Sequence, residues 1–323
     1  NVTDLPQQSR LYASDGTTQI GTFYAQNRIV VPLKKISKPM RQAVVSREDR
    51  RFFRHAGVDI QGVMRAFVAT YVKKGATQGG SSLTQQYVKN VLLLQAQEDN
   101  DPIAEYHASE ETVARKLREM LIAVQMEKTY SKLEILQGYL NIAQFGRGIY
   151  GVEMAARRYF STTADKLDIV QAATIAAITK NPAAFDPSVE SNQKASQRER
   201  NIVLDLMYQE EYISQKQRDE AKAKPLKDTL KLQDAQAGCS ASGDAAFFCD
   251  YVTKKILNSK EFGKTIEERK KLLYEGGLDI YTTMDVNANS AAMKAARAAI
   301  PADDASKMEV MMAAIKPGTG EVL

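Results

Sequence analysis

The densest polar cluster of the chain, from Glu48 to Asp59, joins a Glu-Asp pair to arginines, two phenylalanines and His55. A carboxylate can assist the attack of a sugar hydroxyl, because an alcohol is too weak an acid to react unaided and a carboxylate within hydrogen-bond reach can take its proton. A cluster of charges is more often a solvated face of the protein. Taken alone, this segment is therefore only a candidate for acid–base chemistry.

A second cluster, from Gly79 to Gln86, combines a glycine pair with a run of hydroxyl and amide side chains. Such a run can cap the start of a helix. It can equally present hydrogen-bond donors to phosphate or sugar oxygens. Composition alone leaves both interpretations open.

Two further clusters lie on predicted helices. Arg115, Lys116 and Glu119 fall at i, i+1 and i+4 and so share one helix face. The default interpretation of an Arg–Glu pair at this spacing is a surface salt bridge, worth roughly a few tenths of a kcal/mol. The fourth cluster runs from Lys132 to Asn141, and its default interpretation is an ordinary core helix.

The elements that must position these clusters are mainly helices. Apolar residues recur at helical spacing most clearly over residues 60–72, and a helical pattern extends from about residue 39 to residue 182. Residues 10–33 alternate loosely between apolar and polar and predict a hairpin or strand pair. Residues 198–224 predict two helices that end before Pro225.

Length and composition predict a folded chain of about two domains. The chain has 323 residues, 44% of them hydrophobic, and a net charge of +5, which suits an anionic partner such as phosphate, nucleic acid or a lipid headgroup. It contains no run of roughly 18 to 20 apolar residues and no signal-peptide pattern at its first residues. Because it starts without Met and ends at Leu323 in a strand-like segment, we expect a fragment of a longer protein.

Together, in this order, the four clusters resemble the peptidoglycan glycosyltransferase domain, glycosyltransferase family 51, of bifunctional class A penicillin-binding proteins. The first motif of that family is matched at Glu48, Asp49, Phe52, His55 and Gly57. The second is matched at Gly79, Ser81, Thr84, Gln85 and Gln86, with Ser82 in place of a threonine. The third and fourth are matched at Arg115, Lys116 and Glu119, and at Lys132, Ile135, Leu136, Tyr139, Leu140 and Asn141. The resemblance covers roughly residues 38–225.

The resemblance implies an enzyme that polymerises lipid II into glycan strands. In such enzymes the 4-hydroxyl of an acceptor lipid II attacks the anomeric carbon of the growing, lipid-linked donor chain, polyprenyl pyrophosphate leaves, and the configuration inverts. By this resemblance Glu48 is the general base. Glu119 is a second catalytic residue, which helps to hold a metal ion or to orient the basic pair.

The leaving pyrophosphate needs cationic donors or a divalent metal, and the resemblance implies where these are. Lys89, Arg115 and Lys116, with Gln86, occupy the matching positions. Mg²⁺ or Mn²⁺ suits carboxylate and phosphate ligands better than zinc does, so we expect one of these ions, with Glu119 as a protein ligand. The full set of implied substrate-binding residues is Asp49, Phe52, His55, Ser81, Ser82, Thr84, Gln85, Gln86, Lys89, Arg115, Lys116, Lys132, Tyr139 and Asn141.

Two features depart from the family pattern. Residues 95–111 are long, polar and acidic where the family segment is short, and we expect an exposed loop there. Glu111 stands where the family usually has a basic residue. The transpeptidase motifs are missing, because the single Ser-x-x-Lys, at residues 191–194, has no Lys-Thr-Gly or Ser-x-Asn companion, so no transpeptidase activity is expected from this sequence.

The implied fold is mainly α and lysozyme-like, with a small membrane-facing lobe that includes residues 60–72. We expect an N-terminal β segment over residues 1–37 that follows a removed membrane anchor. The glycosyltransferase domain is expected over residues 38–225, and an α+β linker with the truncated start of a transpeptidase domain over residues 226–323. The expected location is the extracytoplasmic face of the bacterial membrane, and the expected partners are lipid II, lipid-linked glycan, the membrane surface and moenomycin-type inhibitors.

Two cysteines, Cys239 and Cys249, lie in an Ala- and Gly-rich stretch without a nearby histidine. They are too few for an ordinary zinc site, so the alternatives are a disulfide and two unreactive thiols. The short polar loop between them is easily closed, which favours the disulfide. A disulfide in turn indicates an oxidising compartment outside the cytoplasm.

Two other functions remain to be weighed. A lysozyme-like lytic or hydrolytic enzyme would also use a glutamate, but it would act on finished glycan and would have no use for Arg115 and Lys116 beside a phosphate. A noncatalytic basic module for nucleic acid or membrane would need aromatic residues among the basic ones or a recognition helix, and the sequence has neither. We therefore expect no nucleic-acid partner.

Overall fold

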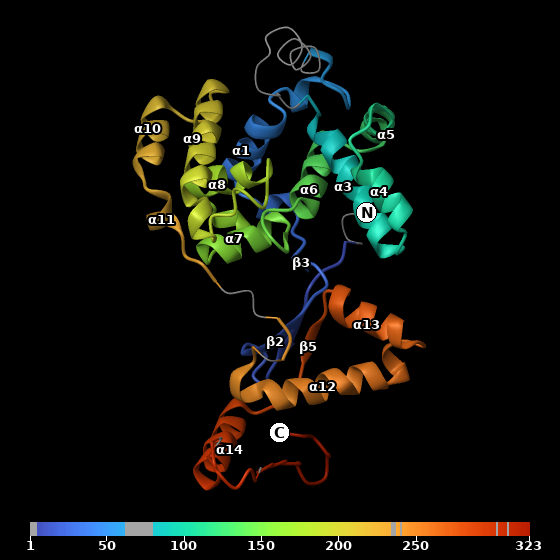
Figure 1. Ribbon diagram of the computed structural model, residues 1–323, viewed down its shortest axis with the longest axis vertical. Coiled ribbons are helices and arrows are strands. Elements are labelled where there is room, and N and C mark those ends of the chain that lie inside the picture. Colours follow the sequence, from blue (N-terminus) through green and yellow to red (C-terminus); the bar gives the residue numbers. More distant parts are fainter. Residues whose placement is uncertain (1–4, 62–79, 234–236, 240, 302, 309) are drawn as a thin grey trace. The chain divides into compact units, whose positions relative to one another are not determined.

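The computed structural model describes residues 5–61, 80–233, 237–239, 241–301, 303–308 and 310–323. The chain divides into two compact units: unit 1 contains Arg28–Gln233, and unit 2 contains Pro6–Asn27 and Asp234–Leu323. Helices dominate the described residues, which confirms the mainly α prediction (Figure 1). None of the described helices is both long enough and apolar enough to cross a membrane.

Unit 1 is a helical body built around one apolar helix. Helix α8 (Ile169–Ile178) is apolar except for Gln171 and Thr174 and is buried along nearly its whole length. Helices α1 (Lys38–Glu48) and α9 (Gln193–Gln209) pack against it. The other helices of unit 1 are α3 (Leu83–Glu98), α4 (Pro102–Ser109), α5 (Val113–Thr129), α6 (Lys132–Ile142), α7 (Val152–Phe160), α10 (Gln215–Ala223) and α11 (Leu226–Thr229). The strands β3 (Asn27–Arg28) and β4 (Ile149–Tyr150) form a short two-stranded pair.

Capping boxes set the first residues of the helices that carry the second and fourth motifs. Ser82 caps α3, with its hydroxyl accepting from the Gln85 backbone N–H and the Gln85 side chain accepting from the Ser82 N–H. Ser131 and Glu134 form the same arrangement at α6. Each box satisfies backbone donors that a helix start otherwise leaves unpaired. The polar run of the second motif therefore does cap a helix.

The exposed loop predicted over residues 95–111 is wrong. Helix α3 continues to Glu98, and α4 occupies most of the remaining segment. Asp101 caps α4, because its Oδ1 accepts from the N–H groups of Ile103 at 3.0 Å and Ala104 at 2.9 Å. Pro102 stands at the first helical position, where proline favours a helix rather than breaking it. Pro102 thus marks a helix start within this segment.

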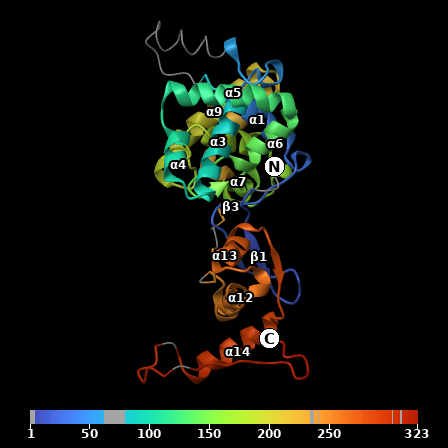
Figure 2. The ribbon, with the colours of Figure 1, turned by 90° about the vertical axis from the view of Figure 1, so that its right-hand side faces the viewer.

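Unit 2 brings together two segments from opposite ends of the chain. Strand β1 (Ser9–Tyr12) lies between β2 (Gln19–Phe23), its antiparallel neighbour, and β5 (Asp279–Tyr281), its parallel neighbour. Helices α12 (Ala246–Asn258) and α13 (Ile266–Glu275) lie against the strands (Figure 2). Helix α14 (Val286–Ala299) has no buried residue. The structure thus differs from the predicted division, in which residues 1–37 form a segment of their own, since long-range strand pairing places β1 and β2 with β5.

A disulfide joins Cys239 to Cys249 at the start of α12, with their Cα atoms 5.4 Å apart. Cys249 is fully buried in the core of unit 2. Replacing both cysteines by alanine is expected to lower the free energy of unfolding of unit 2 by up to about 3 kcal/mol, because the bridge restricts the unfolded chain. Denaturant unfolding of the full chain measures this loss, and reduced wild type should match the variant. Two alkylated thiols in protein isolated without reductant would contradict the bridge.

Most of the helix predicted over residues 60–72 lies outside the described residues, as does Gly79 of the second motif. Ile60 itself is described and is 72% exposed.

Candidate active site

Unit 1 contains a cleft of about 930 Å³ that collects side chains from α1, α3, α5, α6 and the loop after α8. The residues that line it are Arg47, Glu48, Asp49, Arg50, Asp59, Gly80, Ser81, Ser82, Gln86, Lys89, Asn90, Leu93, Arg115, Glu119, Tyr139, Ala143, Gln144, Thr179, Lys180, Pro182, Ile202 and Leu206. Residues from all four motifs therefore meet in one hollow, although the sequence separates them widely.

Glu48 is the last residue of α1, and both its carboxylate oxygens are held by neutral donors. The Gln86 side-chain amide donates to Oε2 at 2.7 Å. The Thr179 hydroxyl lies 2.5 Å from Oε1 and donates to it. The Tyr139 hydroxyl in turn donates to the amide oxygen of Gln86 at 3.2 Å. This arrangement orients the carboxylate through two neutral side chains.

Thr179 did not emerge from the sequence reasoning, which found only the end of a helix before Asn181 and Pro182. It is the C-terminal cap of α8 and lies 131 residues from Glu48 along the chain. No spacing rule connects two residues so far apart.

Tyr139 is buried beneath the cleft, 2% exposed. Burial raises the pKa of its phenol well above the usual 10.0, and the nearby charge of Glu48 raises the pKa further. Burial also raises the pKa of Tyr159, another core phenol.

These raised pKa values predict that the protein loses stability in alkali. Above about pH 10 the unfolded chain releases phenol protons that the folded chain keeps, so the free energy of unfolding should fall with rising pH by up to about 1.4 kcal/mol per unit for each such tyrosine. Tyr139→Phe should make this fall less steep, as read from denaturant unfolding between pH 9 and 11. Tyr130→Phe, which removes a phenol that is 50% exposed, is the control. Equal slopes in wild type and Tyr139→Phe would contradict the prediction.

Asp49 and His55 form a buried pair that holds the first motif against α3. The Asp49 Oδ2 accepts from His55 Nε2 at 2.8 Å and from the backbone N–H of Leu83 at 3.0 Å. Leu83 is the first residue of α3. Asp49 therefore fixes the start of α3 beside the end of α1, which sets the distance between Glu48 and Gln86.

Gly57 brings the first motif into contact with α5. Its φ is +84°, and a Cβ added there would come within 2.8 Å of the Ala123 carbonyl oxygen. Its own carbonyl accepts from the Ser82 hydroxyl at 2.5 Å. Only glycine combines this backbone conformation with so close an approach. The glycine of the motif is thus explained by packing.

Arg115 and Glu119 form an ion pair on α5 at the edge of the cleft, with side chains only 9% and 5% exposed. The default interpretation of this pair as a surface salt bridge is therefore wrong. The Arg115 guanidinium also donates to the backbone carbonyl of Glu110, so Arg115 has two hydrogen-bond partners. Lys89, on α3, lines the same cleft, whereas Lys116 and Glu111 are exposed and are not among the described lining residues.

Other predicted binding residues form contacts outside the cleft lining. Glu127 accepts from Lys132 Nζ at 2.7 Å and from the Thr84 hydroxyl at 2.5 Å, and the Lys132 ammonium lies 4.4 Å from the centre of the Phe52 ring. Asn141 is fully buried and exchanges hydrogen bonds with the backbone of Val31, each of 2.9 Å. The predicted residues found in the cleft lining are Glu48, Asp49, Ser81, Ser82, Gln86, Lys89, Arg115, Glu119 and Tyr139. Those outside the lining are Phe52, His55, Thr84, Gln85, Lys116, Lys132 and Asn141.

In the described part of the chain, no three His, Cys, Asp or Glu side chains are grouped closely enough to hold a metal ion by themselves. Among the described residues that line the cleft, Glu119 is the carboxylate in contact with Arg115. A magnesium ion commonly uses only one or two protein carboxylates and completes its shell with phosphate oxygens and water. The residues therefore fit a cation that is bound jointly by the protein and a phosphate ligand. They do not fit a metal site whose ligands all come from the protein.

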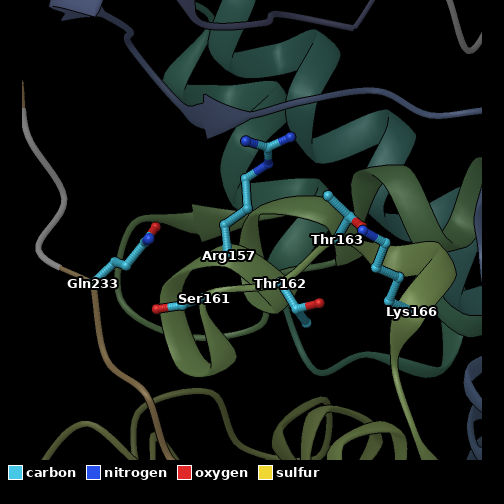
Figure 3. A pocket seen from close by; sticks show the side chains of 6 residues that line it. All are labelled: Arg157, Ser161, Thr162, Thr163, Lys166 and Gln233. Carbon is cyan, nitrogen blue, oxygen red and sulfur yellow. The ribbon is translucent and has the colours of Figure 1, made fainter.

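A second, smaller pocket of about 210 Å³ lies at the end of α7 (Figure 3). Its walls are polar and include Arg157 and Lys166. The Arg157 Nε donates to Glu153 at 2.7 Å, and Glu153 also accepts from the backbone N–H of Ala164 at 2.8 Å. Arg157 is thus largely neutralised by a carboxylate that braces the fold. This pocket lacks the paired carboxylate and donors of the larger cleft.

Comparison with known proteins agrees with the motifs. The family model described as Transglycosylase matches residues 16–208. Penicillin-binding protein 2D of Bacillus subtilis (strain 168) is 34% identical over 319 residues, which cover 99% of this chain and 42% of that protein. Penicillin-binding protein 1A of Aquifex aeolicus (strain VF5) is 35% identical over 289 residues, which cover 90% of this chain and 35% of that protein.

Among solved structures, the crystal structure of Penicillin-Binding Protein 1A from Haemophilus influenzae matches 91% of this chain and 29% of its own, with 19% identity and a TM-score of 0.44. The chain spans less than half the length of the curated relatives it matches. The family match covers more than half of the chain, in agreement with the resemblance of the four motifs. The chain therefore belongs to the transglycosylase family.

Proposed function

We propose that this chain polymerises lipid II, with Glu48 as the general base. The observation that carries the proposal is the Glu48 carboxylate, held by Gln86 and Thr179, in a cleft that also contains Lys89 and the Arg115–Glu119 pair. A base for the acceptor hydroxyl and cations for the leaving pyrophosphate are the two groups that this reaction requires.

In the proposed step the oxygen of the acceptor 4-hydroxyl bonds to the anomeric carbon of the donor chain while the bond from that carbon to the pyrophosphate breaks. The hydroxyl proton moves to Glu48, and the pyrophosphate leaves with the bonding electrons. Glu48 can accept the proton because its two contacts are neutral donors and leave lone pairs on both oxygens. Lys89 and Arg115 stabilise the charge that grows on the pyrophosphate.

A divalent cation, Mg²⁺ or Mn²⁺, fits the same end of the cleft when the pyrophosphate is present. It would neutralise part of the phosphate charge, with Glu119 as its protein ligand. The role of Arg115 is then to fix the direction of the Glu119 carboxylate, since the two side chains form an ion pair that is nearly out of solvent.

The membrane surface is the proposed location of the substrate, on the extracytoplasmic side. Helix α5 exposes Val113, Leu117 and Leu121, at 74%, 55% and 74%. These residues are four apart and so form one apolar stripe on the outer face of the helix that carries Arg115. An exposed apolar stripe beside a phosphate site suits a substrate that combines a pyrophosphate with a long lipid tail.

Incubation of the full chain with labelled lipid II tests the proposal. We expect polymer on a gel, and its loss when a moenomycin-type phosphoglycolipid inhibitor is added. Finished glycan, offered in parallel, should not be shortened. Release of sugar fragments from finished glycan without polymer from lipid II would instead support a lytic enzyme and overturn the proposal.

A further inference from the structure

The Thr179 hydroxyl lies within hydrogen-bond distance of two acceptors at once. One is Oε1 of Glu48, at 2.5 Å, and the other is the backbone carbonyl of Ala176, at 2.8 Å. A hydroxyl has one proton and two lone pairs, so it donates to only one of these acceptors at a time. Which acceptor it serves depends on the charge of Glu48.

When Glu48 is ionised, the carboxylate is the stronger acceptor and takes the Thr179 proton. When Glu48 carries a proton on Oε1, that proton can itself be donated to the Thr179 oxygen. The Thr179 proton then turns to Ala176, whose carbonyl is already in place at 2.8 Å. The hydroxyl can therefore form a hydrogen bond with Glu48 before and after proton transfer.

The other contact of Glu48, from Gln86, cannot reverse its direction. The Gln86 Nε2 is a donor only, and the acceptor oxygen of the same amide already receives the Tyr139 hydroxyl at 3.2 Å. Gln86 therefore keeps donating to Oε2 when Oε1 is protonated, but the nitrogen that faces Glu48 cannot accept a proton from it. Of the two side chains described as contacting Glu48, Thr179 is the one whose contacting atom can both donate to and accept from the carboxyl group.

We propose that Thr179 is a positioning residue for the proposed base, and that its hydroxyl reverses the direction of its hydrogen bond as Glu48 gains and loses the proton of the acceptor sugar. This inference rests on the proposed function. The proton that leaves the acceptor hydroxyl stays on Glu48, and Thr179 keeps its own proton throughout. Thr179 therefore stabilises the reacting state of Glu48 and does not itself react.

Thr179→Val tests this inference, because valine keeps the shape of threonine and removes the hydroxyl. We expect kcat for lipid II polymerisation to fall about 10- to 100-fold, as is typical for the loss of a hydrogen bond to a charged group. KM and the affinity for a moenomycin-type inhibitor should change less than about twofold, because Thr179 acts on the base and not on substrate binding. Thr179→Ser, which restores the hydroxyl, should return kcat to within about threefold of wild type.

Thr174→Val is the matched control, since it makes the same change on the same helix. The Thr174 hydroxyl is fully buried and donates to the Val170 carbonyl at 2.8 Å, outside the cleft lining. This variant should lower the melting temperature and leave kcat unchanged. Melting temperatures of all variants show whether they fold, and Thr179→Ala replaces Thr179→Val if the latter does not.

Wild-type kcat in Thr179→Val, or equal losses in Thr179→Val and Thr179→Ser, would overturn the inference. A loss that appears in KM and inhibitor affinity instead of kcat would also overturn it, because it would make Thr179 a substrate contact. Glu48→Gln, measured in the same series, separates the two proposals. If Glu48→Gln polymerises normally the proposed base is wrong, whereas an inactive Glu48→Gln beside an unimpaired Thr179→Val rejects only the role of Thr179.

Discussion

Glu48→Gln is expected to reduce the initial rate of lipid II polymerisation by at least about 100-fold, the lower end of what a positioned general base contributes. Glutamine has the size of glutamate but does not take up a proton at neutral pH. The new side-chain amide must also fit between two hydrogen-bond donors, Gln86 and Thr179. Its NH₂ group therefore faces one of these donors, unless the Thr179 hydroxyl turns to donate to Ala176. The measurement is polymer formed over time from labelled lipid II.

The control for this variant is Glu220→Gln, which removes a carboxylate that is 64% exposed on α10. It makes the same chemical change outside the cleft lining and should keep the wild-type rate. Inhibitor affinity should be retained in Glu48→Gln, since Glu48 is assigned to proton transfer and not to phosphate binding. A rate above about a tenth of wild type in Glu48→Gln would remove Glu48 from the role of base, because a general base contributes far more than that.

The sequence predicted the site where its residues are local to one helix start or one helix turn. Ser82 and Gln85 follow a capping pattern that is visible in four consecutive residues, and Arg115 and Glu119 follow the i, i+4 rule. In both cases backbone geometry alone determines the contact. The sequence did not predict how exposed the Arg115 and Glu119 side chains are, because their exposure depends on the helices that pack around them.

Contacts between distant segments could not be predicted from spacing. Thr179 reaches Glu48 across 131 residues, and the Arg10–Asp279 ion pair of β1 and β5 joins residues 269 apart. Family motifs mixed two kinds of residue, those that face the cleft, such as Gln86, and those that brace it, such as Asn141. Sequence similarity does not separate these kinds, because residues of both kinds stand in the same motifs.

The two lysines assigned to the pyrophosphate differ in the structure, and this difference predicts different binding. Lys89 is half-buried and lines the cleft, whereas Lys116 is exposed outside the described lining. Lys89→Met is expected to weaken a moenomycin-type inhibitor about 10- to 100-fold, the usual effect of losing a charge-assisted phosphate contact. Lys116→Met should change the affinity less than about threefold, because an exposed, solvated ammonium gains little from a distant anion.

The two variants control for each other, since each replaces one lysine by a side chain of similar length and each lowers the net charge by one. Any effect of overall charge on an anionic ligand is therefore common to both, and their difference isolates direct contact with the phosphate. Titration of labelled inhibitor gives the affinities, and melting temperatures report folding separately. Equal losses would mean that the basic charge attracts the ligand only at long range. A loss confined to Lys116→Met would place the pyrophosphate outside the cleft, and the assignment of Lys89 and Arg115 to the leaving group would then be wrong.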